Sequence, residues 1–471
     1  MKKSILLTTL LGTLAALTPA SATAQNLVIV SMGDSLAAGE GNPNSFSIAG
    51  AVWSSAPCHR SVNNGRRFAS DRMNDLANLS TSFFDFSCSG ASIDAGILGS
   101  QLTSQPDANN GSRTPQIDQV VNALGRVPGT TRTDAVIDIV MISIGVNDVN
   151  FASVVTECLL PNGITDCTTS AAVNTSRNVL ASGAFAAAYD RLGAAIRAKL
   201  PNARHVYITE YPIEMTSAAG NFCGNVDDGS GDASMVGVSA TENEFLFTNI
   251  LLVLNDRVQQ AAGRNGWTFV RGPEDTFATH GYCTSLQRRY LNTLSDSFFR
   301  QGNQNGTMHP NIAGHKAYAD ALIARATLDF NLHLESPRVT RKAEINVGVP
   351  APLALPAQLA LPGVKKAVQF EIGQHPGTLT VTLQHRVLNP PVCVPVFGCT
   401  TPPVPAFSNT AMADAGAGRL NLFSATIPGS EFLLPTQTLE YRAVITATRN
   451  GETRTVTTSK GTIVLGDALV R

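Results

Sequence analysis

The chain has 471 residues, and its 34 Lys and Arg side chains balance 35 Asp and Glu for a formal net charge of −1. This near-neutral balance argues against a nucleic-acid-binding surface as the main function. With 43% hydrophobic and 15% charged residues, the composition excludes disordered, collagenous and coiled-coil proteins and predicts about two to four packed domains.

The N-terminus has the pattern of a secretory signal peptide. Lys2 and Lys3 precede an apolar run, Ile5–Leu17, and Ala22-Thr-Ala24 follows it, so we expect cleavage after Ala24. The run is about 13 residues long, whereas a membrane span needs about 20. No later stretch is long and apolar enough to span a bilayer. We therefore expect a secreted or periplasmic protein in an oxidising compartment, where its eight cysteines pair.

Residues 25–336 alternate β-branched apolar runs with helical periodicity, which predicts a parallel sheet covered on both faces. Apolar side chains recur at helical spacing over Phe185–Ile196 and Phe247–Val258. The second helix is predicted to open with a capping box at Thr241 and Glu244 and to stop at Gly266. The predicted strands are Leu27–Val30, Ser82–Phe86, Ile137–Ile142, His205–Thr209 and Trp267–Val270.

Near residue 335 the pattern changes to that of an all-β domain. A Pro/Ala/Leu-rich linker, Val349–Gly363, precedes short segments of alternating polarity, and Asn450-Gly451 joins two of them in a predicted hairpin. We expect residues 337–471 to form this linker plus an accessory sandwich of the immunoglobulin or fibronectin type III sort, separable from the first domain.

Ser35 follows the first predicted strand directly, in Gly33-Asp-Ser-Leu36. A serine at a strand-to-helix turn is exposed, and its own N–H points out of the helix start, where it can meet a developing oxyanion. This placement suits a nucleophile. The alternative is a serine that only caps the helix.

Two more turns follow strands of the same predicted sheet. Gly90 comes after the second strand, where the lack of a Cβ lets the backbone approach a ligand, and Asn147 comes after the third. Both belong to the carboxyl edge of the sheet, where open α/β folds bind ligands. Asn147 can aim its NH₂ at an anion, or it can simply stabilise the turn.

His309-Pro310 is the last motif. Pro310 at a first helical position would place His309 at the N-cap, where the positive helix end keeps the imidazole neutral and able to accept a proton. His315, six residues on, belongs to another face and is expected to pack or to meet solvent.

Taken together, these blocks resemble the SGNH (GDSL-type) hydrolase superfamily, and the resemblance covers roughly residues 26–328. The serine, glycine, asparagine and histidine of that superfamily match Ser35, Gly90, Asn147 and His309. The spacing of Cys58-His-Arg-Ser61 and Cys88-Ser-Gly90 is similar to that of its secreted, disulfide-bearing bacterial lipase and esterase branch. The resemblance implies a three-layer α/β/α flavodoxin-like fold.

By this resemblance Ser35 attacks the acyl carbon, His309 transfers the proton, and Ser35, Gly90 and Asn147 form the oxyanion hole. No cofactor and no metal are implied. The chain has no Gly-x-Ser-x-Gly nucleophile elbow, no HExxH, and no CxxC or CxxH pair for zinc.

One position departs from the family. Gly306 stands where the family usually has an aspartate three residues before its histidine. The imidazole still needs an acceptor for its other N–H, and a main-chain carbonyl between Gly306 and Met308, that of Gly306 first, is expected to supply it. Asp296 is the side-chain alternative.

The resemblance and proximity along the chain also imply four disulfides, although eight cysteines allow 105 pairings. The expected pairs are Cys58–Cys88, Cys158–Cys167, Cys223–Cys283 and Cys393–Cys399. The acidic segment Asp227–Asp232 lacks the bidentate glutamate of an EF-hand and is expected to be a rim loop rather than a calcium site.

The expected function is a secreted serine esterase acting on a lipid, a phospholipid or an acylated glycan. Apolar residues in the predicted loops 151–160, 215–238 and 276–299 favour lipase or phospholipase A-type esters. The accessory domain is expected to contact a lipid surface or glycan, with no nucleic acid partner. The alternatives are a carbohydrate deacetylase with a glycan-binding β domain and a non-catalytic surface-binding protein.

Overall fold

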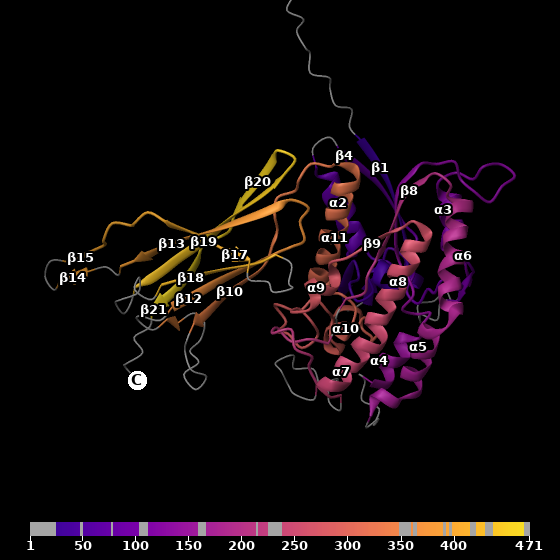
Figure 1. Ribbon diagram of the computed structural model, residues 1–471, viewed down its shortest axis with the longest axis horizontal. Helices are drawn as coiled ribbons and strands as arrows, with labels where there is room; N and C mark the ends of the chain where they lie inside the picture. The colour runs from indigo at the N-terminus through magenta and orange to yellow at the C-terminus, as the bar shows by residue number, and fades with distance from the viewer. Residues whose placement is uncertain are drawn as a thin grey trace, which may run out of the picture.

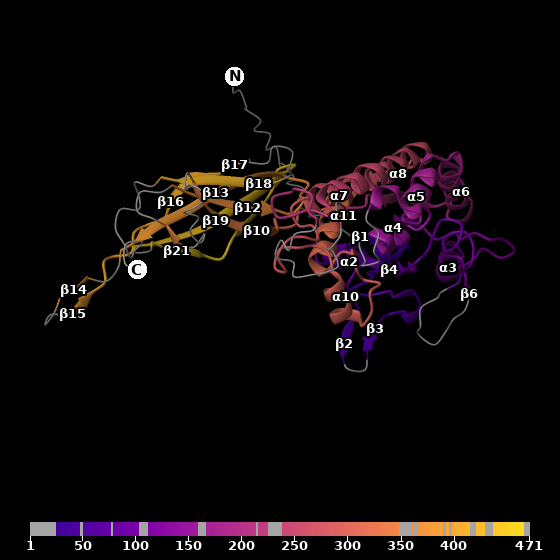
Figure 2. The same ribbon diagram turned by 90° about the horizontal axis from the view of Figure 1, so that it is seen from below.

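The structure is a computed structural model in which an α/β part is followed by a β-rich part (Figure 1; Figure 2). It describes residues 25–465 except 48–49, 77–78, 103–111, 159–165, 213–214, 225–237, 348–358, 361–364, 390–391, 395–397, 415–420 and 429–436. The predicted signal peptide and the acidic segment 227–232 lie outside these residues, as does most of the predicted linker.

Five parallel strands form the central sheet, in the spatial order β4-β1-β7-β8-β9. This order, 2-1-3-4-5 along the chain, is that of the flavodoxin-like fold, as the sequence predicted. The strands are β1 (Gln25–Gly33), β4 (Leu79–Asp85), β7 (Ile137–Ser143), β8 (Ala203–Thr209) and β9 (Thr268–Val270). In the register, Val30 of β1 is opposite Phe84 and Val140.

Two separate apolar cores cover the two faces of this sheet, because successive strand residues point to opposite sides. Leu27 and Ile29 of β1 pack with α2 (Gly65–Asn74) and α11 (Ile312–Phe330). Val30 and Met32 belong to the other core, which includes residues of α3 (Gln116–Ala123), α4 (Phe151–Cys158), α5 (Ala171–Ala181), α6 (Gly183–Lys199) and α8 (Leu252–Asn265). The result is the predicted three-layer α/β/α arrangement.

Shorter elements complete this part of the chain. They are α1 (Ser35–Ala38), α7 (Ala240–Leu246), α9 (Pro273–Phe277) and α10 (Leu294–Gln301), with the hairpins β2 (Ser45–Ser47) with β3 (Gly50–Val52) and β5 (Gln101–Leu102) with β6 (Ser112–Arg113). Figure 2 shows the β2–β3 hairpin beside α10.

The start of α7 differs from the prediction. The capping box is formed by Ser239 and Glu242, each accepting from the other's backbone, so Thr241 and Glu244 lie inside the helix. The capping-box pattern occurs twice in this stretch, at Ser239 and Glu242 and at Thr241 and Glu244, and the helix begins at the earlier one. The helix continues through a π-helical turn, Phe247–Leu251, into α8, which ends at Gly266 in the left-handed conformation, as predicted.

The β-rich part consists of two sheets that enclose one apolar core, which includes Phe370 from the first sheet and Tyr441 and Ile445 from the second. The first sheet contains β10 (Val339–Val347), β12 (Lys365–Ile372), β18 (Leu422–Ile427) and β17 (Ala413–Asp414). The second contains β11 (Leu359–Ala360), β21 (Gly461–Leu465), β19 (Thr438–Arg449), β13 (Thr378–Leu388) and β16 (Ser408–Ala411), with β20 (Glu452–Thr457) paired to β19.

The predicted Asn450-Gly451 hairpin joins β19 to β20, with both turn residues at positive φ. A further ribbon, β14 (Val392–Val394) with β15 (Gly398–Thr400), places the backbones of Cys393 and Cys399 opposite each other. Their side chains lie outside the described part, so this disulfide stays a prediction, as does the immunoglobulin or fibronectin type III assignment.

The two parts meet through polar contacts around the buried carboxylate of Asp320. Asp320 of α11, 3% exposed, accepts from Arg72 of α2 at 2.7 Å and from Arg338 Nε at 3.1 Å. Arg72 also pairs with Glu335, and Arg454 of β20 donates to the Leu334 carbonyl at 2.9 Å. No residue of the β-rich core belongs to either core of the α/β part.

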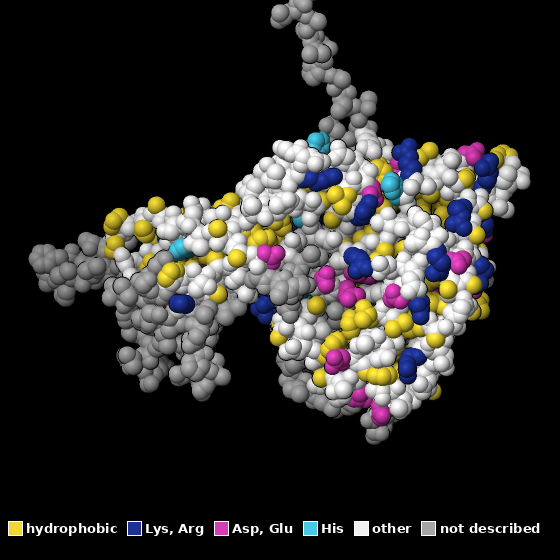
Figure 3. All heavy atoms as spheres, viewed as in Figure 1, with side chains coloured by type: hydrophobic (Ala, Val, Ile, Leu, Met, Phe, Trp, Pro, Cys, Tyr) yellow, Lys and Arg dark blue, Asp and Glu magenta, His cyan; other side chains and the backbone are white. Residues whose placement is uncertain are grey.

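The outer surface fits the balanced composition. On the face shown in Figure 3, basic and acidic side chains lie interspersed over the α/β part. Among the residues that the structure describes, no helix is both long and apolar enough to cross a bilayer.

Because each core closes on itself, we predict that a chain ending at Pro337 folds. Asp320 would lose Arg338 and keep Arg72. The melting temperature should fall below that of the full chain by at least about 2–4 °C, the shift that 1 kcal/mol produces at this size. Circular dichroism and calorimetry measure this. A non-cooperative melt would show that the β strands complete the core of the α/β part.

Candidate active site

Ser35 is the first residue of α1, directly beyond β1. Gly33 makes the turn at φ +141°, and a Cβ there would lie 2.1 Å from the Ser143 carbonyl of β7. Asp34 N–H donates to that same carbonyl at 2.9 Å. The turn is thus fixed to the neighbouring strand by backbone contact, which only glycine at position 33 permits.

Asp34, not Ser35, caps α1. Its Oδ1 accepts from Leu36 N–H at 3.1 Å, and its Oδ2 accepts from the Tyr211 hydroxyl at 2.6 Å. Burial raises the pKa of Asp34, while the Tyr211 hydrogen bond and Arg66 act in the opposite direction. The Ser35 hydroxyl is left available for another partner.

That partner is His309. Its Nε2 lies 2.7 Å from Ser35 Oγ, and its Nδ1 lies 3.1 Å from the Thr307 carbonyl oxygen. Because a carbonyl can only accept, Nδ1 carries the proton in this arrangement and Nε2 accepts from the serine hydroxyl. Thr307 therefore replaces Gly306 as the acceptor. The Gly306 carbonyl instead accepts the backbone N–H of His309 at 3.1 Å.

Steric contact explains the missing aspartate. A Cβ at position 306 would lie 2.6 Å from the Gly41 Cα and 2.9 Å from Ser297 Oγ, so no side chain fits there. Asp296 is engaged elsewhere, since it completes the capping box of α10 with Thr293 and pairs with Arg289 at 2.9 Å.

The prediction that His309 caps a helix is wrong. Asn311 caps α11, accepting from two backbone N–H groups with its side chain, and the helix starts at Ile312. An asparagine is a strong N-cap, and here it directly follows Pro310. His309 instead follows Met308, which adopts a left-handed backbone at φ +67°. Asn292 fixes this strained loop by two backbone hydrogen bonds, at 3.0 Å to Met308 and 2.8 Å to His309.

Gly90 and Asn147 reach the same cavity as Ser35 and His309. Gly90 has φ +80°, and the disulfide Cys58–Cys88 fixes its turn. Asn147 donates to the Ala91 carbonyl at 2.9 Å, which uses one of its two amide protons and ties the two turns together. The described structure also contains the disulfides Cys158–Cys167 and Cys223–Cys283.

The cavity has a volume of about 260 Å³ and one apolar wall. Residues 151–158, expected as a loop, form α4 and supply part of that wall, while no described residue of 276–299 lines the cavity. The apolar lining residues beyond the Ser35 turn are Val146, Phe151, Ala152, Val155, Met308 and Pro310.

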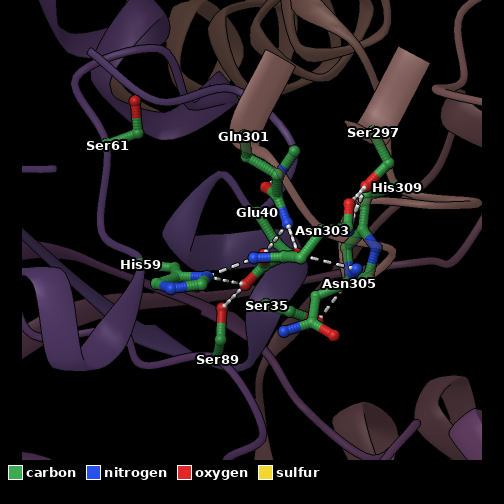
Figure 4. Close-up of polar contacts among 12 residues, drawn as sticks. Ser35, Glu40, His59, Ser61, Ser89, Ser297, Gln301, Asn303, Asn305 and His309 are labelled. Carbon is green, nitrogen blue, oxygen red and sulfur yellow. Dashed lines mark hydrogen bonds and ion pairs between the residues drawn. The ribbon is translucent and has the colours of Figure 1, made fainter. Parts of the chain in front are cut away.

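Glu40 is a buried carboxylate in the cavity wall that the sequence analysis did not identify. Its partners are His59, Ser89 and Gln301, at 2.8, 2.5 and 2.9 Å (Figure 4). Burial raises the pKa of Glu40, but the hydrogen bond and charge of His59 outweigh it, and the pKa falls below its usual value.

Comparison with known proteins decides the family. The chain matches the GDSL-like lipase/acylhydrolase family over residues 31–317, more than half of its length. It belongs to that family. It is therefore an ester hydrolase, and the SGNH resemblance is confirmed.

Solved structures similar to this GDSL hydrolase include an extracellular lipase from Streptomyces rimosus, with 22% identity over 63% of this chain and 98% of that one, at a TM-score of 0.43. Phospholipase A1 from Streptomyces albidoflavus NA297 has 21% identity, 63% and 97% coverage, and a TM-score of 0.43. An acetyl xylan esterase from Butyrivibrio proteoclasticus has 13% identity over 65% of this chain and 64% of that one, at a TM-score of 0.31. No curated protein sequence matches.

Other titratable groups of the hydrolase lie outside the serine–histidine contact. His315 is buried and accepts from Gly65 N–H at 3.2 Å, so it packs, and burial lowers its pKa to about 3. Within the described ranges, no group of three His, Cys, Asp or Glu residues has the arrangement of a metal site.

Asp148 links the Asn147 turn to the Gly90 turn. Both of its carboxylate oxygens accept from Ile93 N–H, at 3.1 and 3.2 Å. Burial raises its pKa from 3.8 to about 7, so the folded protein holds this proton more tightly than the unfolded chain.

The contribution of Asp148 to stability is therefore complete below about pH 4 and is lost as the pH rises toward 7. An amide at this position cannot titrate, so we predict that the melting temperature of Asp148→Asn rises relative to wild type between about pH 4 and pH 8. Glu210, whose pKa is also about 7, affects both proteins and cancels in the difference. Calorimetry across this range tests the prediction, and a difference independent of pH would contradict it.

Proposed function

We propose that this protein is a secreted serine esterase in which Ser35 is the nucleophile and His309 the general acid and base. The observation that carries the proposal is the 2.7 Å contact between Ser35 Oγ and His309 Nε2, with the Thr307 carbonyl on the other ring nitrogen. This arrangement fixes the tautomer that a general base requires.

The reaction begins when Ser35 Oγ attacks the ester carbonyl carbon and His309 Nε2 takes the hydroxyl proton. The carbonyl oxygen becomes an oxyanion, which accepts from the Ser35 and Gly90 backbone N–H groups and from the free amide proton of Asn147. The C–O bond to the alcohol then breaks as His309 returns the proton to the leaving oxygen. Water attacks the acyl-enzyme by the same path, which releases the carboxylic acid and restores Ser35.

The cavity favours lipid or phospholipid acyl esters over acetylated sugars. An acetyl group needs little apolar space, whereas the wall that includes Phe151, Val155 and Met308 provides an apolar surface beside Ser35. The acyl chain would lie along α4, and the alcohol would leave toward the polar side of the cavity, where Gln304 and Asn305 lie.

Export follows from the cysteine chemistry as well as from the N-terminal pattern. Disulfides persist in oxidising compartments, and the described part of the chain contains three of them and no free cysteine. We infer cleavage after Ala24 and a periplasmic or extracellular location. Contact of the β-rich domain with a lipid surface or a glycan stays a prediction.

We predict that Ser35→Ala and His309→Ala each lower kcat for p-nitrophenyl butyrate by at least about 10⁴-fold, because each removes one partner of the proton transfer. Steady-state kinetics measures this, with circular dichroism to confirm the fold. Substantial turnover by Ser35→Ala would place the nucleophile elsewhere, and an inert wild type would favour a non-catalytic protein.

Asp296→Asn is the matched control. Asp296 lies on α10 in contact with Thr293 and Arg289 rather than with His309, so its amidation should leave most of kcat. A loss comparable to that of His309→Ala, with the melting temperature unchanged, would make Asp296 the third catalytic member.

Acyl-chain preference gives a separate prediction. Val155→Phe fills part of the apolar wall on α4, so the ratio of kcat/KM for p-nitrophenyl decanoate to that for the acetate should fall about 10-fold or more. Val136→Phe, at an exposed position before β7, is the control and should leave the ratio unchanged. An unchanged ratio in Val155→Phe, or faster release of acetate from acetyl-xylan than of acyl chains from phospholipid, would contradict the lipid preference.

A further inference from the structure

Glu40 lies two residues beyond the end of α1, on the segment that starts with Ser35. Its backbone N–H donates to the Ser35 carbonyl at 3.1 Å, so its backbone is fixed to the nucleophile's own turn. The side chain is only 2% exposed, although it contributes to the cavity wall. Figure 4 shows it between His59, Ser89 and Gln301, which come from three other segments of the chain.

The first connection leads to the Gly90 turn. Ser89 Oγ donates to Glu40 Oε2 at 2.5 Å, one residue before the glycine whose N–H faces the oxyanion in the proposed mechanism. The Ser89 backbone is held as well, since its N–H donates to the Cys58 carbonyl at 3.0 Å and its carbonyl accepts from Gln101 at 2.7 Å. Glu40 thus links the Ser35 turn to the Gly90 turn through a side-chain hydrogen bond.

The second connection leads to the loop that carries His309. The side-chain NH₂ of Gln301 donates to Glu40 Oε1 at 2.9 Å and to Asn303 Oδ1 at 2.6 Å, and its side-chain oxygen Oε1 accepts from Gly41 N–H at 2.8 Å. From there Ser297 donates to the Asn303 carbonyl and accepts from Gly306 N–H at 2.9 Å. Gly306 directly precedes Thr307, the acceptor of the imidazole proton.

The third connection leads to His59, which lies beside the buried carboxylate. His59 Nδ1 lies 2.8 and 3.0 Å from the two carboxylate oxygens, and the His59 ring stacks on Trp53 at 4.5 Å between centroids. His59 itself follows Cys58 of the disulfide that fixes the Gly90 turn. A carboxylate with about four lone-pair sites and no proton can accept from all these donors at once.

We propose that Glu40 is a positioning residue for ester hydrolysis, and that its carboxylate holds the Gly90 turn and the His309 loop in register with Ser35. The proposal rests on the proposed roles of these three residues. Glu40 touches neither His309 nor the substrate's reacting atoms in this account. We expect its effect on the rate to pass through the geometry of the oxyanion hole and of the general base. Its charge also acts on His309 without contact, and Ser89→Ala, which keeps that charge, isolates the effect on geometry.

Glu40→Gln tests the proposal, because glutamine keeps the shape but turns one acceptor oxygen into a donor NH₂, so that Ser89 or Gln301 loses the carboxylate oxygen to which it donates. Active sites are counted by complete labelling with a fluorophosphonate, and kcat for p-nitrophenyl butyrate is expressed per labelled site. We expect a fall of about 10²-fold, typical of a misplacement of about 1 Å, with KM within about twofold of wild type.

Asp138→Asn is the matched control. Asp138 is also a buried carboxylate, accepting from Val28 N–H and Arg204 at 2.8 Å each, but it lies near the amino end of β7, opposite the catalytic edge. A loss of stability alone would lower its melting temperature and leave kcat per site intact. Equal kcat per site in Glu40→Gln, Asp138→Asn and wild type would overturn the proposal.

Ser89→Ala keeps the proposal testable if Glu40→Gln does not fold. It removes only the connection from Glu40 to the Gly90 turn, and kcat per site should fall about 10-fold at unchanged KM, a smaller loss than that of a whole oxyanion donor. An unchanged kcat in this variant would overturn the proposal. If Ser35→Ala stays fully active, the proposed function itself is wrong. If Ser35→Ala is inactive and Glu40→Gln is fully active, only the proposed role of Glu40 is wrong.

Discussion

The site depends on a contact between two glycines. Gly41, six residues after Ser35, and Gly306, three residues before His309, lie backbone against backbone, and a Cβ on either would come within 2.6 Å of an atom of the opposing segments. This approach lies between segments 274 positions apart in sequence, in which Ser35 Oγ and His309 Nε2 are 2.7 Å from each other. The same contact leaves no room for an aspartate before the histidine, so the imidazole takes a peptide carbonyl as its acceptor.

The parallel sheet supplies the other constraint. Its carboxyl edge gathers the turns after β1, β4 and β7, which bear Ser35, Gly90 and Asn147, while α11 begins just beyond His309 on one covered face. Strand pairing places these turns at the same edge of the sheet but does not fix their exact distances and orientations. Three further contacts join the turns to one another and to their surroundings. They are the Cys58–Cys88 disulfide, the Asn147–Ala91 hydrogen bond and the hydrogen bonds of the buried Glu40 carboxylate.

The sequence predicted a covered parallel sheet from apolar periodicity, whereas its flavodoxin-like order was implied by the resemblance to the SGNH hydrolases. The sequence also indicated Ser35, Gly90 and Asn147, small or polar residues directly after strands, and all three line the cavity. It predicted a carbonyl acceptor but not Thr307, since every residue carries a carbonyl and only the backbone path selects one. Asn311 displaced His309 from the helix cap through competition between neighbours. Glu40 left no local signal, because its partners lie 19, 49 and 261 positions away.

The junction at Asp320 joins the two parts of the chain through a buried carboxylate. Asp320 bonds to Arg72 within the α/β part and to Arg338 at the start of the β-rich part, so rotation of one part against the other would break the Arg338 bond and leave the buried carboxylate with Arg72 alone. The loss of one of its two partners by a buried carboxylate carries a cost, which favours the angle between the two parts at which both arginines are bonded. A surface bound by the β-rich part would then face the cavity at that favoured angle.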